Sequence, residues 1–165
     1  MNDHPSDPDG LTHLDDRGQA RMVDVGAKDV THRTAVAEAR VVMRPDVAAR
    51  LLVGDLPKGD ALPVARIAGI QAAKRTPELI PLCHGIALTS VEVEVDVDAD
   101  EGVAVVTATA RAADRTGVEM EAMTAAAVAS LTLYDLVKAV QRDVVITDVR
   151  LRRKTGGRSG DVELP

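Results

Sequence analysis

The segment from Ser90 to Asp98 alternates strictly between valines and acidic residues. The two alternating sets are Val91, Val93, Val95 and Val97, and Glu92, Glu94, Asp96 and Asp98. Because successive side chains of a strand point to opposite faces, this pattern predicts a strand with one buried and one solvated face. The turn sequence DADEG (98–102) follows, and VAVVTATARAAD (103–114) then predicts the returning strand of a hairpin. A half-buried antiparallel sheet of this kind must be covered on its apolar face by another layer.

The flanking segments predict the remaining elements. TAVAEARVVM (34–43) predicts a strand with alternate alanines on one face, although alanine suits a helix as well. Pro45 and Gly54 bound a short helix within 44–55, and Pro63 lies in the first turn of a second helix over 61–75. The Ala-rich run 118–142 has no Gly or Pro and predicts a long helix, and 144–154 predicts a last strand.

The resulting order β-α-α-β-β-α-β is the split βαβ pattern with an extra helix in the first crossover. We therefore predict an α+β fold, a ferredoxin-like antiparallel sheet with helices packed on one face. Residues 1–10 combine Asp, Pro, Asn, Ser and Gly and predict a flexible N-terminal lead-in. Residues 11–165 are then expected to form a single domain.

Composition limits the core and the partners of the chain. It has no Phe or Trp and one Tyr, so aliphatic side chains must fill the core. Its 20 Lys and Arg against 26 Asp and Glu give a formal net charge of −6, and an acidic chain without aromatic platforms predicts no nucleic-acid partner. No apolar run reaches the ~20 residues of a membrane span, which predicts no membrane insertion. A polar N-terminus and a single cysteine predict a cytoplasmic location.

Cys83 and His84 form the first candidate site, because the only cysteine adjoins one of four histidines. Neighbouring residues of a strand point to opposite faces, so the pair is poorly placed to act as nucleophile and base. The other histidines, His4, His13 and His32, lie scattered upstream, without the close spacing of zinc ligands. Two interpretations remain: a buried structural pair, or part of a ligand pocket in which His84 supplies a polar contact.

Charged residues of the second half provide further candidates. Glu119 and Glu121 lie two apart in VEMEAM, where acids also favour a helix start without any other role. Asp135 and Lys138 are three apart on the predicted helix and are therefore surface neighbours. Such a pair is usually a weak exposed ion pair, but a lysine beside apolar neighbours can also transfer protons. The basic, Gly-rich segment 149–161 either binds phosphates or is a solvated tail.

Six motifs then occur together. They are MVDV (22–25), KGD (58–60), ARIAGIQAAKRTPELIPLCH (65–84), TGVEMEAMTA (116–125), LYDLVKAVQ (133–141) and KTGGRSGD (154–161). In these motifs the chain, from about Leu11 to its end, closely resembles the cyclic pyranopterin monophosphate synthase family of molybdenum-cofactor biosynthesis. The resemblance implies a lyase that rearranges a cyclised dihydroguanosine triphosphate into a pyranopterin with a cyclic phosphate and releases diphosphate. It also implies no metal or organic cofactor, and a homohexamer, a trimer of dimers with active sites at the dimer interface.

The resemblance implies roles for individual positions. Lys58 and Lys138 match the family's catalytic lysines, and Asp135 matches its active-site aspartate. The positions that match substrate contacts are Leu82, Cys83, His84, Met120 and Glu121. Glu119 lies close by, and Arg33 and Lys154 are expected to contact phosphates. Gly85 stands where the family commonly has proline, so the loop that carries His84 lacks a fixed φ.

The chemistry requires protons to be moved, and the two lysines are expected to act as acid and base with pKa values lowered by neighbouring cations. On one straight helix, Glu121 and Asp135 are 14 residues apart (135 − 121), roughly 21 Å. One small ligand cannot touch both. Either the helix begins after Glu121, or two chains share the pocket.

Two functions from other classes compete with an enzyme. RNA-recognition modules share the ferredoxin-like sheet but display aromatic residues on it, and this chain has no Phe or Trp. The alternative function is a small-molecule sensor that binds a nucleotide or anion without catalysis. A sensor has no reason to keep Lys58, Asp135 and Lys138 together, so the enzyme is favoured.

Overall fold

The computed structural model describes residue 15, residues 17–157 and residues 160–165, so the predicted lead-in over 1–10 lies outside the described part. Within that part, one antiparallel sheet has the strand order β2-β3-β1-β4-β5. Its strands are β1 (Thr31–Val42), β2 (Leu88–Asp98), β3 (Val103–Asp114), β4 (Val145–Thr155) and β5 (Val162–Glu163). The first four strands have the ferredoxin-like order, with β1 and β3 in the centre, which confirms the predicted fold class.

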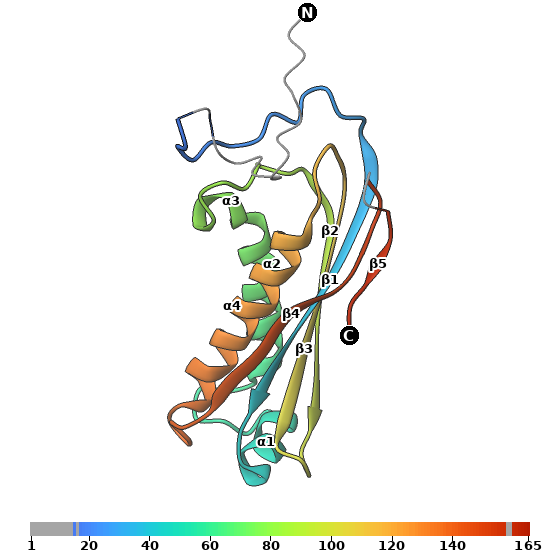
Figure 1. The fold of residues 1–165 in the computed structure, drawn as a ribbon. Coiled ribbons are helices and arrows are strands. Elements are labelled where there is room, and N and C mark those ends of the chain that lie inside the picture. Colours follow the sequence, from blue (N-terminus) through green and yellow to red (C-terminus); the bar gives the residue numbers. More distant parts are fainter. Residues whose placement is uncertain (1–14, 16, 158–159) are drawn as a thin grey trace, which may run out of the picture.

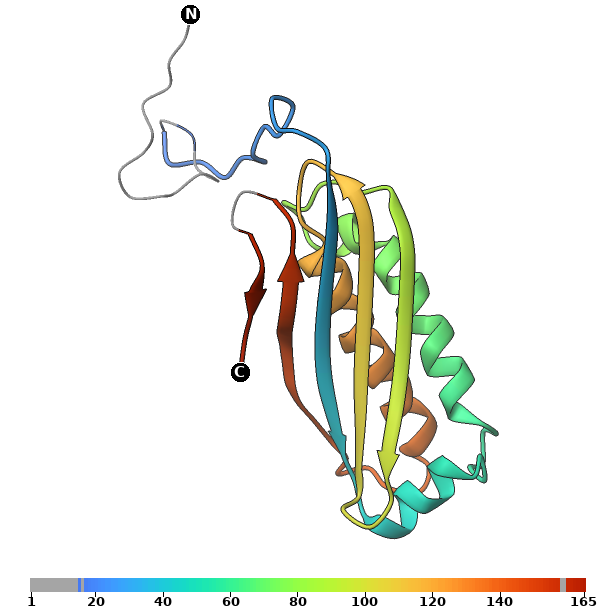
Figure 2. The same ribbon diagram turned by 90° about the vertical axis from the view of Figure 1, so that its right-hand side faces the viewer.

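Helices cover one face of this sheet. They are α1 (Pro45–Leu52), α2 (Ala61–Lys74), α3 (Thr76–Leu79) and α4 (Glu119–Val137). The two long helices, α2 and α4, lie side by side along the sheet, and the opposite face stays open (Figure 1, Figure 2). Helix α1 lies at one end of this layer, and α3 lies at the other end, near the segment that enters β1 (Figure 1). The two ends of α4 are therefore surrounded by different parts of the chain.

Small side chains form the contact between the sheet and the helices. On β1, Ala35, Ala37, Ala39 and Val41 are fully buried, which confirms the alternation predicted over 34–43. Four alanines of α4 are also fully buried: Ala122, Ala125, Ala126 and Ala129. Because alanine adds little volume at each contact, α4 can lie close to the sheet along its length.

Helix α2 approaches α4 at Gly69. A Cβ atom at this position would lie 2.9 Å from the carbonyl oxygen of Ala125 and 3.0 Å from a methyl group of Val93. Both neighbours belong to the packed interior, where a backbone carbonyl has little freedom to move. Glycine at this position therefore sets the separation of the two long helices.

We predict that Gly69→Ala lowers the free energy of unfolding by up to about 2 kcal/mol. Overpacking costs about 1–3 kcal/mol, and the gain of about 1 kcal/mol that alanine brings to an unconstrained helix offsets part of this cost. Urea denaturation measures the effect, with Gln71→Ala, an exposed position of the same helix, as the matched control. An unchanged or higher stability of Gly69→Ala would contradict the proposed close packing.

Some predicted boundaries are wrong. The long helix ends at Val137 instead of continuing to residue 142. The Val137 carbonyl oxygen accepts backbone hydrogen bonds from both Val140 and Gln141, and the bond from Val140, three residues on, belongs to a tighter turn than the α-helix. The Gln141 side chain then accepts a hydrogen bond of 2.8 Å from the backbone N–H of Arg44, a long-range contact that no local pattern reveals. Helix α3 and strand β5 were not predicted, because elements of four and two residues are too short for periodicity to detect.

Helix α4 also passes a simple test for a membrane span, because it is long and apolar enough on length and composition alone. In the structure, 56% of the apolar 18-residue stretch of this helix is buried inside the protein. Buried core helices of globular proteins are apolar in the same way. Packing against the sheet accounts for its composition.

Candidate active site

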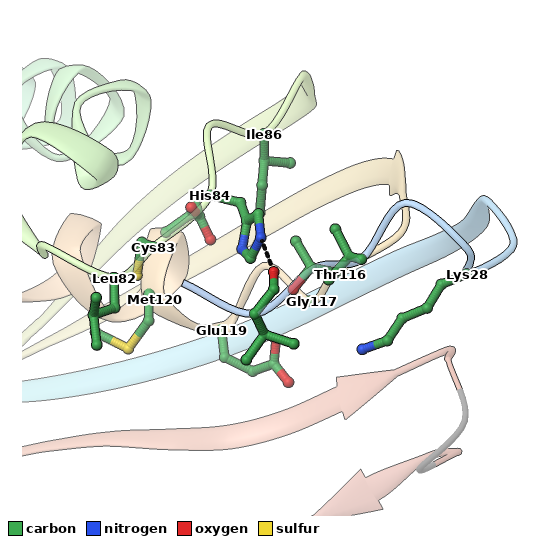
Figure 3. Close-up of a pocket in the computed structure, with 12 residues that line it drawn as sticks. Lys28, Leu82, Cys83, His84, Ile86, Thr116, Gly117, Glu119 and Met120 are labelled. Carbon is green, nitrogen blue, oxygen red and sulfur yellow. Dashed lines mark hydrogen bonds between the residues drawn. The ribbon is translucent and has the colours of Figure 1, made fainter. Parts of the chain in front are cut away.

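A cavity of 360 Å³ lies at the end of the molecule where α4 begins. Its walls come from the segment before β1, the loop before β2, the turn after β3 and the first turn of α4. The lining residues are Val23, Val25, Lys28, Leu82, Cys83, His84, Ile86, Thr116, Gly117, Glu119, Met120 and Glu121. Figure 3 shows an apolar end at Leu82 and Met120 and a cationic end at Lys28. All five residues expected to contact substrate therefore line one cavity.

Cys83 and His84 lie in an irregular loop over 83–87 and not in a strand, so the argument from opposite strand faces does not apply to them. The Nε2 of His84 lies 2.7 Å from the carbonyl oxygen of Val23 (Figure 3). A carbonyl oxygen can only accept, so His84 donates from Nε2 and holds the segment before β1 against the cavity. Burial, together with the Glu121 carboxylate, raises the pKa of the Cys83 thiol, which keeps it protonated and weakly nucleophilic.

Glu121 is the buried acid of this cavity. It is 2% exposed, and its Oε2 has no hydrogen-bond partner among the described residues. Burial raises the pKa of Glu121 to about 7, and the nearby carboxylates of Glu119 and Asp114 add to this effect. The free protein therefore holds this carboxyl group close to half-protonated at neutral pH.

This pKa predicts how stability depends on pH. The pKa of Glu121 is about 7 in the folded state and near 4.5 ordinarily, so the folded state binds the proton more tightly. The stability that Glu121 contributes is complete below about pH 4.5, declines as the pH rises to about 7 and then stays constant. Glu121→Gln abolishes this loss, and the variant should gain up to about 3 kcal/mol over the wild type between pH 4.5 and 8.

Urea denaturation of the wild type and of Glu121→Gln across this pH range measures the difference in their free energies of unfolding. This difference isolates Glu121, because all other titrating groups are present in both proteins. Glu94→Gln, on the exposed face of β2, is the matched control and should show no such gain. A stability difference between Glu121→Gln and wild type that stays constant with pH would refute the raised pKa.

A second cavity of 460 Å³ adjoins the first and shares Lys28, Thr116, Gly117 and Glu119 with it. Its other lining residues are Asp29, Thr31, Arg33, Arg115, Lys154 and Gly157. Four cationic side chains thus face one space, from the segment before β1 and from β1, β4 and the turn after β3. Clustered guanidinium and ammonium groups are suited to phosphate groups.

Local geometry fixes these cations. The Nε of Arg115 donates to the Lys28 carbonyl oxygen at 3.0 Å, and Lys154 forms an ion pair of 3.0 Å with Glu119. Gly157 has a φ of +77°, and a side chain there would overlap the Arg33 guanidinium. Arg33 and Lys154, both expected to contact phosphates, therefore line the same cavity.

The predicted catalytic residues form a separate cluster at the other end of α4. Asp135 receives two lysines: the Nζ of Lys58 lies 2.7 Å from its Oδ2, and the Nζ of Lys138 lies 2.5 Å from its Oδ1. Lys58 Nζ also donates to the Asp135 backbone carbonyl oxygen at 3.0 Å. The structure thus brings Lys58, Asp135 and Lys138 together within one chain, as their joint occurrence in the sequence suggested.

The KGD motif explains how Lys58 reaches α4. Gly59 has a φ of +89°, a conformation that only glycine adopts at low cost. Asp60 then caps the start of α2, where its side chain accepts a hydrogen bond of 3.2 Å from the N–H of Leu62. The turn and the cap fix the loop so that Lys58 points toward the end of α4.

The ionisation of this cluster differs from the expectation. Hydrogen bonds from Lys138 and Lys58 lower the pKa of Asp135 to about 2. The same contact with Asp135 raises the pKa of Lys138, whereas lowered lysine pKa values were expected. The expectation was wrong for Lys138 because its nearest charged neighbour is a carboxylate and not another cation.

The two groups of site residues do not meet within one chain. Helix α4 begins at Glu119, so Glu121 and Asp135 lie on one helix, 14 residues and roughly 21 Å apart. A helix that begins after Glu121 was therefore the wrong alternative. Sequence reasoning also missed Lys28, Thr116 and Arg115 as lining residues, because they lie in irregular segments without periodic signals.

No cluster of three or more His, Cys, Asp or Glu side chains suited to a metal ion occurs among the described residues. The geometry defines a class of protein: a ferredoxin-like α+β domain in which a cavity with one apolar end and a buried carboxyl group adjoins a cationic cavity. Such a pair of cavities suits a ligand that has both a ring system and phosphate groups.

Comparison with known proteins agrees with this class. Residues 22–157 match the MoaC family. The chain is 58% identical over 151 residues to a cyclic pyranopterin monophosphate synthase of Roseiflexus sp. (strain RS-1), covering 92% of this chain and 96% of the relative. It is 58% identical over 164 residues to the protein of the same name from Streptomyces coelicolor, covering 96% and 95%. The chain therefore belongs to the MoaC family, which confirms the resemblance found in its motifs.

Proposed function

We propose that the chain is a lyase of molybdenum-cofactor biosynthesis that converts cyclised dihydroguanosine triphosphate into cyclic pyranopterin monophosphate and releases diphosphate. The match to the MoaC family over residues 22–157 is the observation that carries this proposal. The paired cavities support it, because the substrate combines a guanine-derived ring with a triphosphate. We further propose that residues 11–165 act as one domain in the cytoplasm.

Different parts of the site have different roles in the proposed reaction. A hydroxyl group of the substrate attacks the α-phosphorus, the bond from this phosphorus to the bridging oxygen breaks, and diphosphate leaves. Arg33, Arg115 and Lys154 line the cavity that would bind the phosphates and stabilise the departing charge. Lys58 and Lys138 transfer protons, and Lys138 begins as the acid because Asp135 keeps it protonated.

A second copy of the chain would complete the site. Val64, Ile67 and Leu131 are 47%, 61% and 58% exposed on α2 and α4, so the helical layer has apolar side chains without cover. If two such layers pack about a two-fold axis near the middle of α4, the partner's Asp135 comes next to Glu121. We propose this dimer as the catalytic unit, assembled three times into the hexamer that the resemblance implies.

Turnover provides the first test. Lys58→Ala and Lys138→Ala should each lower the rate of diphosphate release from the cyclised triphosphate by at least ~10²-fold, the usual effect of a positioned acid or base. Both side chains are exposed, so the variants should remain folded in circular dichroism. Lys74→Ala, an exposed lysine at the end of α2, is the control and should retain activity. Nucleotide binding without diphosphate release by the wild type would favour the sensor instead.

Complementation tests the shared site. Arg33→Ala removes a cation near the cavities, and Lys138→Ala removes a lysine of the distant cluster. A mixed dimer of these variants would have one site with neither lesion, so an equimolar mixture should recover about a quarter of wild-type activity. Lys58 and Lys138 belong to one cluster, so mixing Lys58→Ala with Lys138→Ala should recover none.

Subunit exchange must be demonstrated separately, for instance by mass spectrometry of differently labelled chains. Recovery by the lysine pair, or its absence in the Arg33 mixture after exchange, would contradict the arrangement. Light scattering that gave only a 17.4 kDa monomer would exclude the dimer itself.

A further inference from the structure

The turn that follows α4 carries one of the two lysines of the cluster around Asp135. Helix α4 ends at Val137, and Lys138 is the first residue beyond it. The chain then turns through Arg142 and enters β4 at Val145, at the same end of the molecule as α1 (Figure 1). The position of Lys138 therefore depends on what holds this turn.

The sequence of this segment does not itself end a helix. The stretch LVKAVQR (136–142) contains no Gly and no Pro, and its leucine, lysine, alanine, glutamine and arginine all favour helices. A continued helix would pair the Ala139 N–H with the Asp135 carbonyl oxygen, four residues back. Side-chain contacts must therefore hold the helix end at Val137.

The helix end makes the Asp135 carbonyl oxygen available to a lysine. Among the described residues, the Nζ of Lys58 donates to this oxygen at 3.0 Å, in the place of the Ala139 N–H of a continued helix. The same Nζ lies 2.7 Å from Oδ2 of the Asp135 side chain. A helix that continued past Val137 would compete with Lys58 for the carbonyl oxygen. The end of the helix is thus part of the lysine cluster.

Two side chains of the LYDLVKAVQ motif hold the turn, and neither has a role in the proposed reaction. The hydroxyl group of Tyr134 donates to the Arg142 carbonyl oxygen at 3.0 Å, across the turn. The side chain of Gln141 is buried and accepts a hydrogen bond of 2.8 Å from the Arg44 N–H at the start of α1. Gln141 thus fixes the end of the turn to α1, and Tyr134 fixes it to α4.

Tyr134 holds Lys138 from both sides along the chain. Its carbonyl oxygen accepts a hydrogen bond of 2.9 Å from the Lys138 N–H, and its hydroxyl group fixes Arg142 further on. Its ring packs against the buried core, which anchors it to the domain. Asp135 raises the pKa of Lys138, and the Tyr134 phenol lies near enough to add to this effect. The phenol is therefore close to the lysine as well as to the turn that carries it.

We propose that Tyr134 is a positioning residue of the site: its hydroxyl group holds the turn after α4 in the shape that keeps both lysines against Asp135. The inference rests on the proposed function, in which these lysines transfer protons. A lysine side chain is long and flexible, so its ammonium group is placed only as well as its backbone and its partner are fixed. Displacement of a reacting group by about 1 Å can lower a rate by about 10²-fold.

Tyr134→Phe removes the hydroxyl group and keeps the ring in the core. The variant should lower kcat for diphosphate release about tenfold and leave KM within about twofold, because the lysines move protons and the cavities bind the substrate. Thr132→Val is the matched control. It removes another hydroxyl group of α4, which donates to the Val128 carbonyl oxygen at 2.8 Å, and should keep the wild-type kcat. A kcat of Tyr134→Phe within about twofold of the wild type would overturn the proposal.

Trace acetylation of the full chain, followed by mass spectrometry of each lysine, tests the position of the lysines without turnover. In Tyr134→Phe, Lys58 and Lys138 should be acetylated about two- to fivefold faster, which corresponds to the loss of an exposed ion pair. Lys74, exposed at the end of α2, should not change, and Thr132→Val should change none of the three. Unchanged rates at Lys58 and Lys138, or an equal increase at all lysines, would overturn the proposal.

The two measurements separate this inference from the proposed function. If the wild type releases no diphosphate, the function is refuted, and the acetylation rates still decide whether Tyr134 places the lysines. If Tyr134→Phe loses turnover while both lysines keep their acetylation rates, the phenol acts on the substrate itself and the positioning role is refuted.

Discussion

The close contact between α4 and the sheet determines where every site residue lies. Alanines on both sides of this contact allow a 19-residue helix to lie flat along β1 and β3, and Gly69 allows α2 to approach it. The first turn of α4 then forms part of a cavity wall, and its last turn holds Asp135. Since an α-helix is stiff, the separation of these two ends is set by residue count and not by the surrounding loops.

Two carboxylates of the site form ion pairs with lysines within the protein. Asp135 lies between two lysines, and Glu119 pairs with Lys154 at the boundary of the two cavities. A substrate anion must compete with these carboxylates for the same cations, and only a ligand with several charges can replace their interactions at once. This internal competition favours a triphosphate over a single small anion. Glu121 is the exception, because it is acidic, buried and without a cation of its own.

The parts of the fold that could be predicted are those in which a local residue pattern matches the burial of a whole face of a strand. The valines of β2 and the alanines of β1 alternate because one face of the sheet is buried and the other is open. The helix end at Val137, by contrast, involves Gln141 and Arg44, which are 97 residues apart. The motifs predicted site residues that the structure gathers in one cavity and one lysine–aspartate cluster, but they did not predict the direction of the Lys138 pKa shift, which depends on the position of Asp135. Lys28 and Arg115 were not predicted as lining residues, because the irregular segments that contain them have no periodic residue pattern.

Tyr134 is the only aromatic residue of the chain, and it precedes Asp135 on the last turns of α4. Its hydroxyl group donates to the Arg142 carbonyl oxygen at 3.0 Å, so the ring is held beside the lysine cluster. With no tryptophan in the chain, all intrinsic protein fluorescence arises from this one position. Emission from the unlabelled protein therefore reports on the surroundings of Asp135 alone. In the shared-site dimer, the fluorophore of each chain would respond to a ligand bound in the cavity of the other.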